Sequence, residues 1–330
     1  MERIPLSNSA FEGDNNAYLF AEGSETVLID TGDWMDTTRR QLRSGLREHN
    51  VEFSDIDQIF LTHWHPDHTG LAGVIQQESD AIVRIHTNDA SLVEGDKSAW
   101  QEMHDMQRAY FDEWGMPRNK QEVLLERMAG PGTTDVTPSV TPFADGDIFE
   151  FNGHELTVVH TSGHADGLCI FEMDLHDGRE IFSGDALLPV YTPNVGGADV
   201  RVDHPLEKYL RALQAIADAQ YDTAWPGHRD PIDDPTGRAE YIIHHHEERA
   251  WKILDALDRL GPCETWIVSD DLFGELQDIH ILHGPGESYA HLEHLERAGI
   301  VERIGNQYQL APEISDALAE TSTKRWSLEY

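Results

Sequence analysis

Four residues of metal-binding type stand within one hexapeptide, His-Trp-His-Pro-Asp-His at 63–68, directly after a short apolar run. Imidazole and carboxylate are the groups that bind zinc and its neighbours in proteins. In a loop that leaves a strand, alternate side chains point the same way, so His63 and His65 can share one ion. Asp67 and His68 lie just past the turn and point to a second ion. The hexapeptide therefore predicts a two-metal site at the end of a strand.

Three further candidate ligands each follow a predicted strand and stand directly after a glycine: His164, Asp185 and His228. A glycine at such a place lets the backbone pass closely without steric conflict. Each of the three, taken alone, is more often an ordinary loop residue. Together with the hexapeptide they bring the number of candidate ligands to seven, which is enough to complete two coordination spheres.

Strand-like and helix-like segments alternate in the first half of the chain, and this pattern predicts an α/β fold. A second β-rich section follows between about residues 147 and 183, then an amphipathic helix over about 206–219 and one more strand at 223–228. Two β-rich halves, each followed by helices, predict two packed sheets with helices outside, an αββα sandwich. The corresponding domain spans 1–237.

A segment at 98–130 differs from its surroundings because aromatic and methionine residues recur in it at helical spacing. It predicts a helical insertion that packs a small core of its own. A lid or pocket wall is the alternative, since such side chains line apolar ligand sites. The residues concerned are Trp100, Met103, Met106, Tyr110, Phe111 and Trp114.

From about residue 238 the pattern becomes helical, with helices predicted at 238–260, 264–273 and 287–298. Two short strands then pair across Gly305-Asn306, a hairpin signal. Helices that end in a small β-wing resemble a winged-helix domain, so 238–330 is interpreted as a linking helix with a winged-helix-like domain. The histidine run 244–246 is interpreted as a solvated helix face, with a substrate contact as the alternative.

The net charge is extreme: 24 basic and 61 acidic residues give −37. The acidic residues are spread along the whole chain, which suits a protein in multimolar salt, where charges are screened within a few ångströms. We therefore expect a cytoplasmic protein of a salt-accumulating halophile, with an ordinary acidic protein as the alternative. No basic stripe is present to meet nucleic-acid phosphates or an anionic membrane.

Targeting and redox signals point to the same compartment. No apolar stretch of about 18 residues spans a membrane, and the amino terminus has no apolar signal region. Cys169 and Cys263 lie far apart and support no disulfide framework, which fits a reducing environment.

The order of these motifs resembles the metallo-β-lactamase superfamily, specifically its hydroxyacylglutathione hydrolase-like branch, over about residues 15–235. Asp30, in Ile-Asp-Thr-Gly, matches the first motif of the family, and the hexapeptide matches the second. The resemblance implies an αββα fold in which Asp30 orients ligands from behind. It also implies that His63, His65 and His164 bind one metal, that Asp67, His68 and His228 bind the other, and that Asp185 bridges them.

The segments 188–196 and 205–210 resemble a subgroup that carries a C-terminal winged helix and includes a β-lactamase-like endoribonuclease. In the implied mechanism, two divalent ions activate a hydroxide that attacks the substrate. Asp67 orients this hydroxide and accepts its proton. Tyr191 is a candidate donor to the oxyanion, with a packing role as the alternative. Zinc suits the ligands best, and iron or manganese also fit.

The leading expectation for activity is hydrolysis of a small thioester or ester, as in the glyoxalase II reaction, or of a lactone. Phosphodiester hydrolysis of RNA is an alternative, disfavoured because Glu287, Glu293 and Glu296 outnumber Arg297 on the recognition-like helix. An iron persulfide dioxygenase is another. A third is a DNA-binding regulator whose metal site is vestigial. The winged-helix-like domain is expected to pack on the core or to form a homodimer.

Overall fold

The computed structural model describes residues 1–8, 13–128, 136–175 and 178–314. Its first sheet has the strand order β1-β2-β3-β4-β5-β6. The first three strands pair in antiparallel fashion, and β3 to β6 run parallel. The strands are β1 (Glu2–Leu6), β2 (Asn15–Phe20), β3 (Val27–Ile29), β4 (Gln58–Phe60), β5 (Ile82–His86) and β6 (Val140–Phe143).

The second sheet has the order β11-β10-β9-β8-β7. Its strands pair in antiparallel fashion except for β10 and β11, which run parallel. The helix that connects these two parallel strands is α7 (Pro205–Ala219), as expected for a parallel crossover. The strands are β7 (Ile148–Phe151), β8 (His154–His160), β9 (Cys169–Leu175), β10 (Gly178–Gly184) and β11 (Thr223–Pro226).

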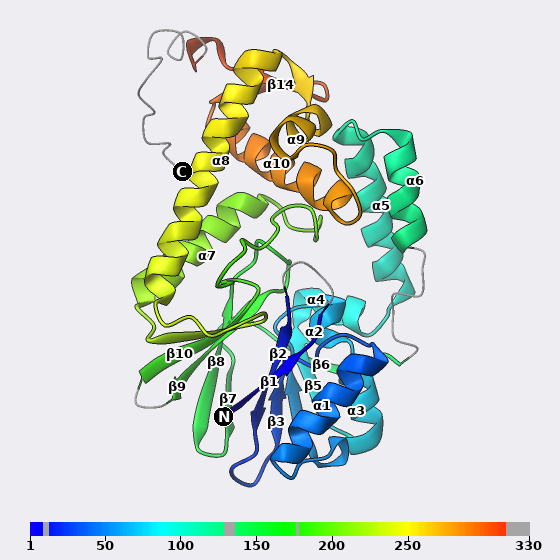
Figure 1. Cartoon of the computed structure of the whole chain (residues 1–330), viewed down its shortest axis with the longest axis vertical. Helices are drawn as coiled ribbons and strands as arrows, with labels where there is room; N and C mark the ends of the chain where they lie inside the picture. Colours follow the sequence, from blue (N-terminus) through cyan, green and yellow to red (C-terminus); the bar gives the residue numbers. More distant parts are fainter. Residues whose placement is uncertain (9–12, 129–135, 176–177, 315–330) are drawn as a thin grey trace.

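The two sheets pack face to face over an aromatic core. Phe60 of the first sheet lies edge-on to Phe171 of the second at 5.9 Å between ring centroids, and Tyr18 lies edge-on to Phe182 at 5.0 Å. Such edge-to-face pairs contribute beyond their buried area. Figure 1 shows α1 (Asp36–Glu48) and α3 (Ala72–Ser79) on the outer side of the first sheet. The predicted αββα sandwich is confirmed.

Short elements connect the sandwich. A 3₁₀ turn (Phe53–Asp55) follows α1, α2 (Pro66–Thr69) begins inside the hexapeptide, and α4 (Thr87–Val93) follows β5. Among the described residues, none of the helices has both the length and the apolar character needed to cross a membrane.

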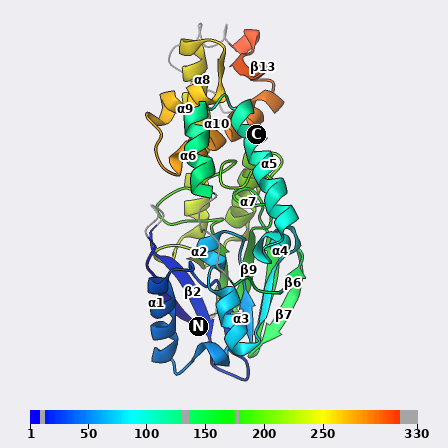
Figure 2. The ribbon, with the colours of Figure 1, turned by 90° about the vertical axis from the view of Figure 1, so that its right-hand side faces the viewer.

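The predicted insertion consists of α5 (Lys97–Glu113) and α6 (Arg118–Met128), while residues 129–130 lie outside the described ranges. Its aromatic side chains do not form a separate core. Tyr110 and Trp114 lie 5.3 and 5.9 Å from the ring of Tyr289 in α10. Trp100 lies edge-on to Trp64 of the hexapeptide at 5.5 Å. The insertion therefore connects the metal-site motif to the C-terminal helices, and Figure 2 shows α6 in front of α10, which it contacts.

The C-terminal part begins with α8 (Pro235–Leu260), so the predicted boundary at 237/238 falls inside a continuous helix. The predicted hairpin is confirmed: β13 (Val301–Ile304) pairs with β14 (Gln307–Leu310). The remaining elements are β12 (Cys263–Glu264), which pairs with β14, α9 (Thr265–Phe273) and α10 (His280–Arg297). Residues 315–330 lie outside the described ranges, and the division into two domains and the winged-helix likeness stay predictions.

Helix α10 starts seven residues before the predicted residue 287, and the part that was not predicted contains Gly284, Pro285 and Gly286. Such residues ordinarily end a helix, and this is why the sequence pattern missed its first turns. The glycine is required by packing: a Cβ on Gly286 would lie 2.2 Å from the Cα of Gly197 in the loop after β10. Helix and loop therefore meet backbone to backbone.

Candidate metal centre

All seven predicted ligands lie together at one end of the sandwich, where strands of both sheets finish. His63 and His65 follow β4, and Asp67 and His68 stand in the short helix α2. The other three follow strands of the second sheet: His164 comes after β8, Asp185 after β10 and His228 after β11. Residues far apart in the chain thus meet because parallel and antiparallel strands end at the same edge.

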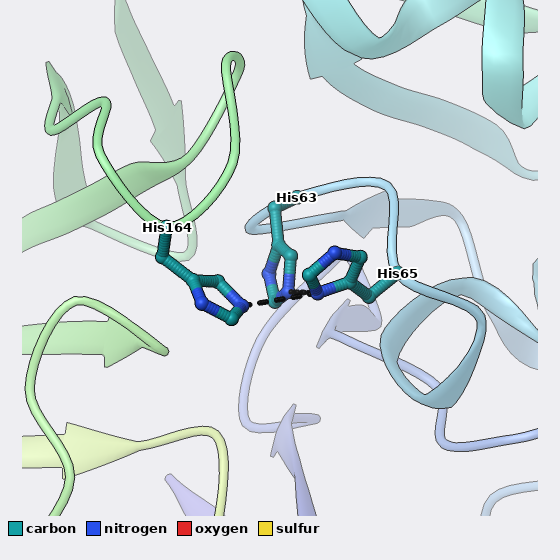
Figure 3. Close-up of side chains that lie close together, drawn as sticks. All are labelled: His63, His65 and His164. Carbon is teal, nitrogen blue, oxygen red and sulfur yellow. Dashed lines mark hydrogen bonds between the residues drawn. The ribbon is translucent and has the colours of Figure 1, made fainter. Parts of the chain in front are cut away.

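The first trio is formed by His63, His65 and His164. Nε2 of His63 lies 2.9 Å from Nδ1 of His65, and Nε2 of His164 lies 3.0 Å from the same atom. Figure 3 shows the three imidazole rings turned toward one another from two separate loops. The three nitrogen atoms converge on a common point, as the ligands of one ion do.

The second trio is formed by Asp67, His68 and His228. Oδ2 of Asp67 lies 3.4 Å from Nε2 of His228 and 3.9 Å from Nε2 of His68. Asp185 stands between the trios. Its Oδ1 lies 3.4 Å from Nε2 of His68 and 3.6 Å from Nε2 of His228, whereas its Oδ2 lies 3.5 Å from Nε2 of His164. One carboxylate thus turns one oxygen toward each trio.

Hydrogen bonds on the outer side of the rings determine which nitrogen carries the proton. Nδ1 of His164 donates to the carbonyl of Asn194 at 2.8 Å, and Nδ1 of His228 donates to the carbonyl of Gly13 at 3.0 Å. A carbonyl oxygen only accepts, so in a neutral ring Nε2 is left with its lone pair directed into the site. This is the tautomer that a metal requires.

Asp30 completes this outer layer behind His68. Its Oδ2 accepts from Nδ1 of His68 and from Oγ1 of Thr62, each at 2.8 Å, and its Oδ1 accepts from the backbone N–H of Thr62. Oγ1 of Thr62 in turn accepts from Nδ1 of His63 at 3.1 Å. Asp30 has a φ of 55°, an uncommon value outside glycine that favours Asp and Asn. Its predicted orienting role therefore has a direct geometric basis.

Burial and charge act against each other in the site. Burial lowers the pKa of His63 well below its ordinary value, and the neighbouring His68 and His65 lower it further. Burial also disfavours the charged form of His228, but the Asp185 carboxylate outweighs it and raises the pKa of His228 to about 9. Burial opposes ionisation of Asp185 as well, yet His228 and His68 hold its pKa well below the usual range. His63 in the first trio is thus neutral, whereas His228 and Asp185 stabilise each other's charged forms.

Divalent metal ions fit these residues. Nε2 of His68 and Oδ1 of Asp185 are buried atoms without a hydrogen-bond partner, and both face the site. Nε2 of His63 and Nε2 of His164 both lie about 3 Å from Nδ1 of His65, which can donate to only one of them, whereas a cation among the three nitrogens would satisfy all of them. Imidazole and carboxylate donors of this kind accept zinc, iron or manganese. The donor set does not select among them.

A buried ionic network behind the hexapeptide was missed in the sequence. The carboxylate of Asp89 accepts from the backbone N–H of Trp64 and that of Gly167, and Asp199 accepts from the indole N–H of Trp64. Arg201 pairs with both carboxylates at 2.7 and 2.6 Å. The network therefore ties the loop of His63 and His65 to the loop of His164. These residues carry no local motif, so only the fold identifies them.

The structure bears on three of the sequence interpretations. Tyr191 has 41% of its surface exposed, so it does not pack in the core; its ring lies 4.9 Å from the guanidinium of Arg229, the neighbour of His228. The interpretation of 244–246 as a solvated face is wrong for His246, which is fully buried against His291 of α10. Glu287, which was counted among the acidic residues of the recognition-like helix, is also buried.

Comparisons with known proteins agree with this geometry. The family model described as "Metallo-beta-lactamase superfamily" matches residues 10–228. The chain is 30% identical over 246 residues to "Beta-lactamase-like protein 2 homolog" of Drosophila melanogaster, covering 72% of this chain and 66% of that protein. It is 29% identical over 297 residues to "Probable metallo-hydrolase YqjP" of Bacillus subtilis, covering 86% and 88%.

A solved structure extends the likeness to the C-terminal helices. The crystal structure of a metallo-beta-lactamase family protein from Thermus thermophilus superimposes with a TM-score of 0.79 at 30% identity. It covers 94% of this chain and 98% of that one, so the likeness includes helices beyond the residues that the family model matches. With its fold and its histidine and aspartate clusters, this chain belongs to the metallo-β-lactamase superfamily and is a hydrolase of that family.

Proposed function

We propose that this hydrolase cleaves a small thioester or ester, lactones included, with two divalent ions held by the seven residues of the centre. The observation that carries the proposal is Asp185, whose two carboxylate oxygens face different trios. Two ions bound there supply a hydroxide near neutral pH and polarise the carbonyl that it attacks. A fungal relative named "Thioesterase pkgB", of Emericella nidulans, supports this substrate class; it is 27% identical over 244 residues, which are 72% of this chain and 54% of that protein.

Asp67 is the residue that we assign to the nucleophile. Burial would raise the pKa of its carboxyl, but His68 and His228 outweigh burial and lower it, so the group is ionised at neutral pH. Its side chain is 30% exposed, so solvent reaches the centre at this residue. Nδ2 of Asn15 donates to its Oδ2 at 3.2 Å and fixes its rotamer. A carboxylate held in this way can orient a water molecule and accept its proton.

Tyr191 is retained as the proposed donor to the developing oxyanion. Nη2 of Arg238 donates to its backbone carbonyl at 2.9 Å, and Arg229 lies against its ring, so the residue is held near His228. Tyr191 is 41% exposed, and a phenol in such a position can donate to a bound substrate. Tyr191→Phe should lower kcat with little change in KM if the phenol donates in the transition state.

The charge of the chain supports a small substrate over RNA. A net charge of −37 repels a polyphosphate, and this repulsion is weakened but not reversed by salt. We further propose zinc as the native metal, a cytoplasmic location in a salt-accumulating halophile, and docking of the C-terminal part on the catalytic sandwich. A homodimer through that part stays a prediction, which light scattering tests.

The test is a substrate panel assayed on protein of known metal content. The protein would be loaded separately with zinc, manganese and iron and offered thioesters, carboxylic esters, lactones, phosphodiesters, short RNA and a glutathione persulfide. Hydrolysis of thioesters or esters that disappears with a chelator and returns with zinc is the expected result. Cleavage of RNA alone, or oxygen consumption with the persulfide, would contradict the proposal. Specific DNA binding without any hydrolysis would favour the regulator instead.

A further inference from the structure

The orientation of the predicted ligand His164 depends on a loop 30 residues further along the chain. Nδ1 of His164 donates to the backbone carbonyl of Asn194, and the two atoms are 2.8 Å apart. This hydrogen bond fixes both the tautomer and the direction of the ring. Whatever holds the peptide of Asn194 in place therefore also aims Nε2 of His164 into the first trio.

The residue that holds this peptide is Glu287, which stands in α10 of the C-terminal part. Its Oε2 accepts from the backbone N–H of Val195 at 3.1 Å and from Nδ2 of Asn194 at 3.2 Å. Asn194 also donates to the carbonyl of His283 in the same helix at 3.1 Å. The carbonyl that accepts from His164 and the N–H that donates to Glu287 thus belong to the same peptide group, between Asn194 and Val195.

Close backbone packing makes this connection stiff. A Cβ on Gly196 would lie 2.8 Å from the carbonyl oxygen of Gly286, and one on Gly286 would lie 2.2 Å from the Cα of Gly197. The loop can therefore approach α10 only because glycines stand on both sides. Figure 1 shows the loop that follows β10 rising from the sandwich to the underside of α10.

Glu287 is buried and forms an ion pair with an arginine. Glu287 is 5% exposed, and Nη1 of Arg249 from α8 pairs with its Oε1. His246 and His291 pack beside the pair; burial lowers the pKa of both, that of His291 to about 3, so neither supplies a second positive charge. A buried ion pair gives little stability compared with apolar residues of the same shape. Retaining a carboxylate here is better explained by the two hydrogen bonds that it accepts from residues 194 and 195.

We propose that Glu287 is a positioning residue for the metal centre, acting through the Asn194 carbonyl on His164. The C-terminal helices are then part of the metal site and not merely attached to it. This inference rests on the proposed role of His164 as a ligand. It predicts that a substitution in α10, which contains none of the seven predicted ligands, lowers the affinity of the protein for one of the two metal ions.

The experiment compares Glu287→Met with Glu293→Met, nearly two helical turns further along α10. Glu293 also links α10 to the sandwich, by accepting from Nδ1 of His204 at 2.6 Å, but it has no hydrogen bond to residues 194–195. Zinc affinity is measured by chelator competition on the full chain, and the cobalt-substituted protein is followed by its absorption spectrum. Glu287→Met should weaken one of two zinc ions by about tenfold or more and alter the cobalt spectrum. Glu293→Met should do neither.

Two further variants keep the test decisive. Glu287→Met leaves Arg249 unpaired and could prevent folding. The double variant Arg249→Met/Glu287→Met removes both charges, so it should fold and should still show the lowered affinity for one zinc ion. Glu287→Gln retains an amide oxygen that can accept from Val195, so it should restore part of the affinity.

Three outcomes separate the possibilities. Equal zinc affinity in the Glu287→Met and Glu293→Met variants would overturn the inference. So would a third zinc ion in the wild type that is lost in Glu287→Met while the other two keep their affinity, because His246, Glu287 and His291 would then form a metal site of their own. A wild-type chain that binds no metal would defeat the proposed function instead.

Discussion

Oδ2 of Asp30 lies 2.8 Å from Nδ1 of His68, and both side chains are buried. An amide in place of the carboxylate would turn a donor toward either Nδ1 of His68 or the donors of Thr62. In Asp30→Asn we therefore expect His68 to change tautomer and protonate Nε2, which faces the second trio. The affinity for one metal ion should fall by roughly 10- to 100-fold. Asp33→Asn, at a neighbouring position of intermediate exposure, is the control, and metal bound after equilibrium dialysis is the measurement.

Asp67→Ala should remove hydrolysis almost completely, because it takes away both a predicted ligand and the group assigned to the nucleophile. We expect a loss of at least about 100-fold in kcat, with one ion still bound by the trio that contains His164. Retention of full activity would mean that the assay reports a contaminant or another site. Circular dichroism at matched salt checks that the variant is folded.

Arg201→Met should lower the free energy of unfolding more than the substitution of an exposed arginine does. The substitution leaves Asp89 and Asp199, both fully buried, without their cation. Breaking a buried pair in this way costs about 3–5 kcal/mol. Arg211→Met removes a surface pair with Glu207 and should have little effect, since exposed ion pairs contribute little. Urea unfolding of both variants, followed by tryptophan fluorescence, would show a shift confined to the Arg201 variant.

Acidification should destabilise the chain partly through His291. Burial, with Arg249 adding to it, lowers the pKa of His291 to about 3 in the folded protein. The ordinary pKa of histidine is about 6.5, so the unfolded chain takes up a proton first, and the stabilisation present above pH 6.5 is lost as pH falls. Between pH 6.5 and 5 this amounts to about 2 kcal/mol. In His291→Leu the pH dependence should shrink by that amount, whereas His244→Ala, at an exposed position, should leave it unchanged.

Salt should stabilise the protein well beyond the range in which ordinary proteins respond. With 61 acidic residues against 24 basic ones, repulsion acts along the whole chain in dilute buffer. At about 1 M salt the screening length is only about 3 Å, and this repulsion is largely removed. The midpoint temperature of thermal unfolding should rise steadily between about 0.1 and 2 M KCl. Equal stability in dilute buffer and in strong salt would contradict the halophilic interpretation.

The sequence predicted that these seven residues would come together, because each lies next to a strand whose apolar pattern is strong. His63 to His68 follow β4 directly, and His164, Asp185 and His228 each follow a strand and a glycine. Strand ends meet at one edge of a sheet, so local patterns were sufficient to bring these residues together. The αββα arrangement followed from the same strand–helix alternation.

The residues that support the ligands could not be predicted in this way. Asn194 uses its backbone carbonyl, which has no sequence signature, and Asp89 and Asp199 act from positions that are distant in the chain. The start of α10 was missed because Pro285 and two glycines ordinarily end helices. Nothing local in the sequence indicates that Glu287, in the same helix, is buried. In each case tertiary packing outweighed the local preference.

The predicted ligands come from both halves of the sandwich, and His65 and His164, whose nitrogens lie 3.0 Å apart, are separated by 99 residues of chain. An ion shared by such residues is a cross-link, and its effect grows with the length of chain that it closes. Neither half holds all the predicted ligands of this ion until the two sheets have docked. Metal uptake would thus come last in folding and would lock only those chains in which the two halves have already paired correctly.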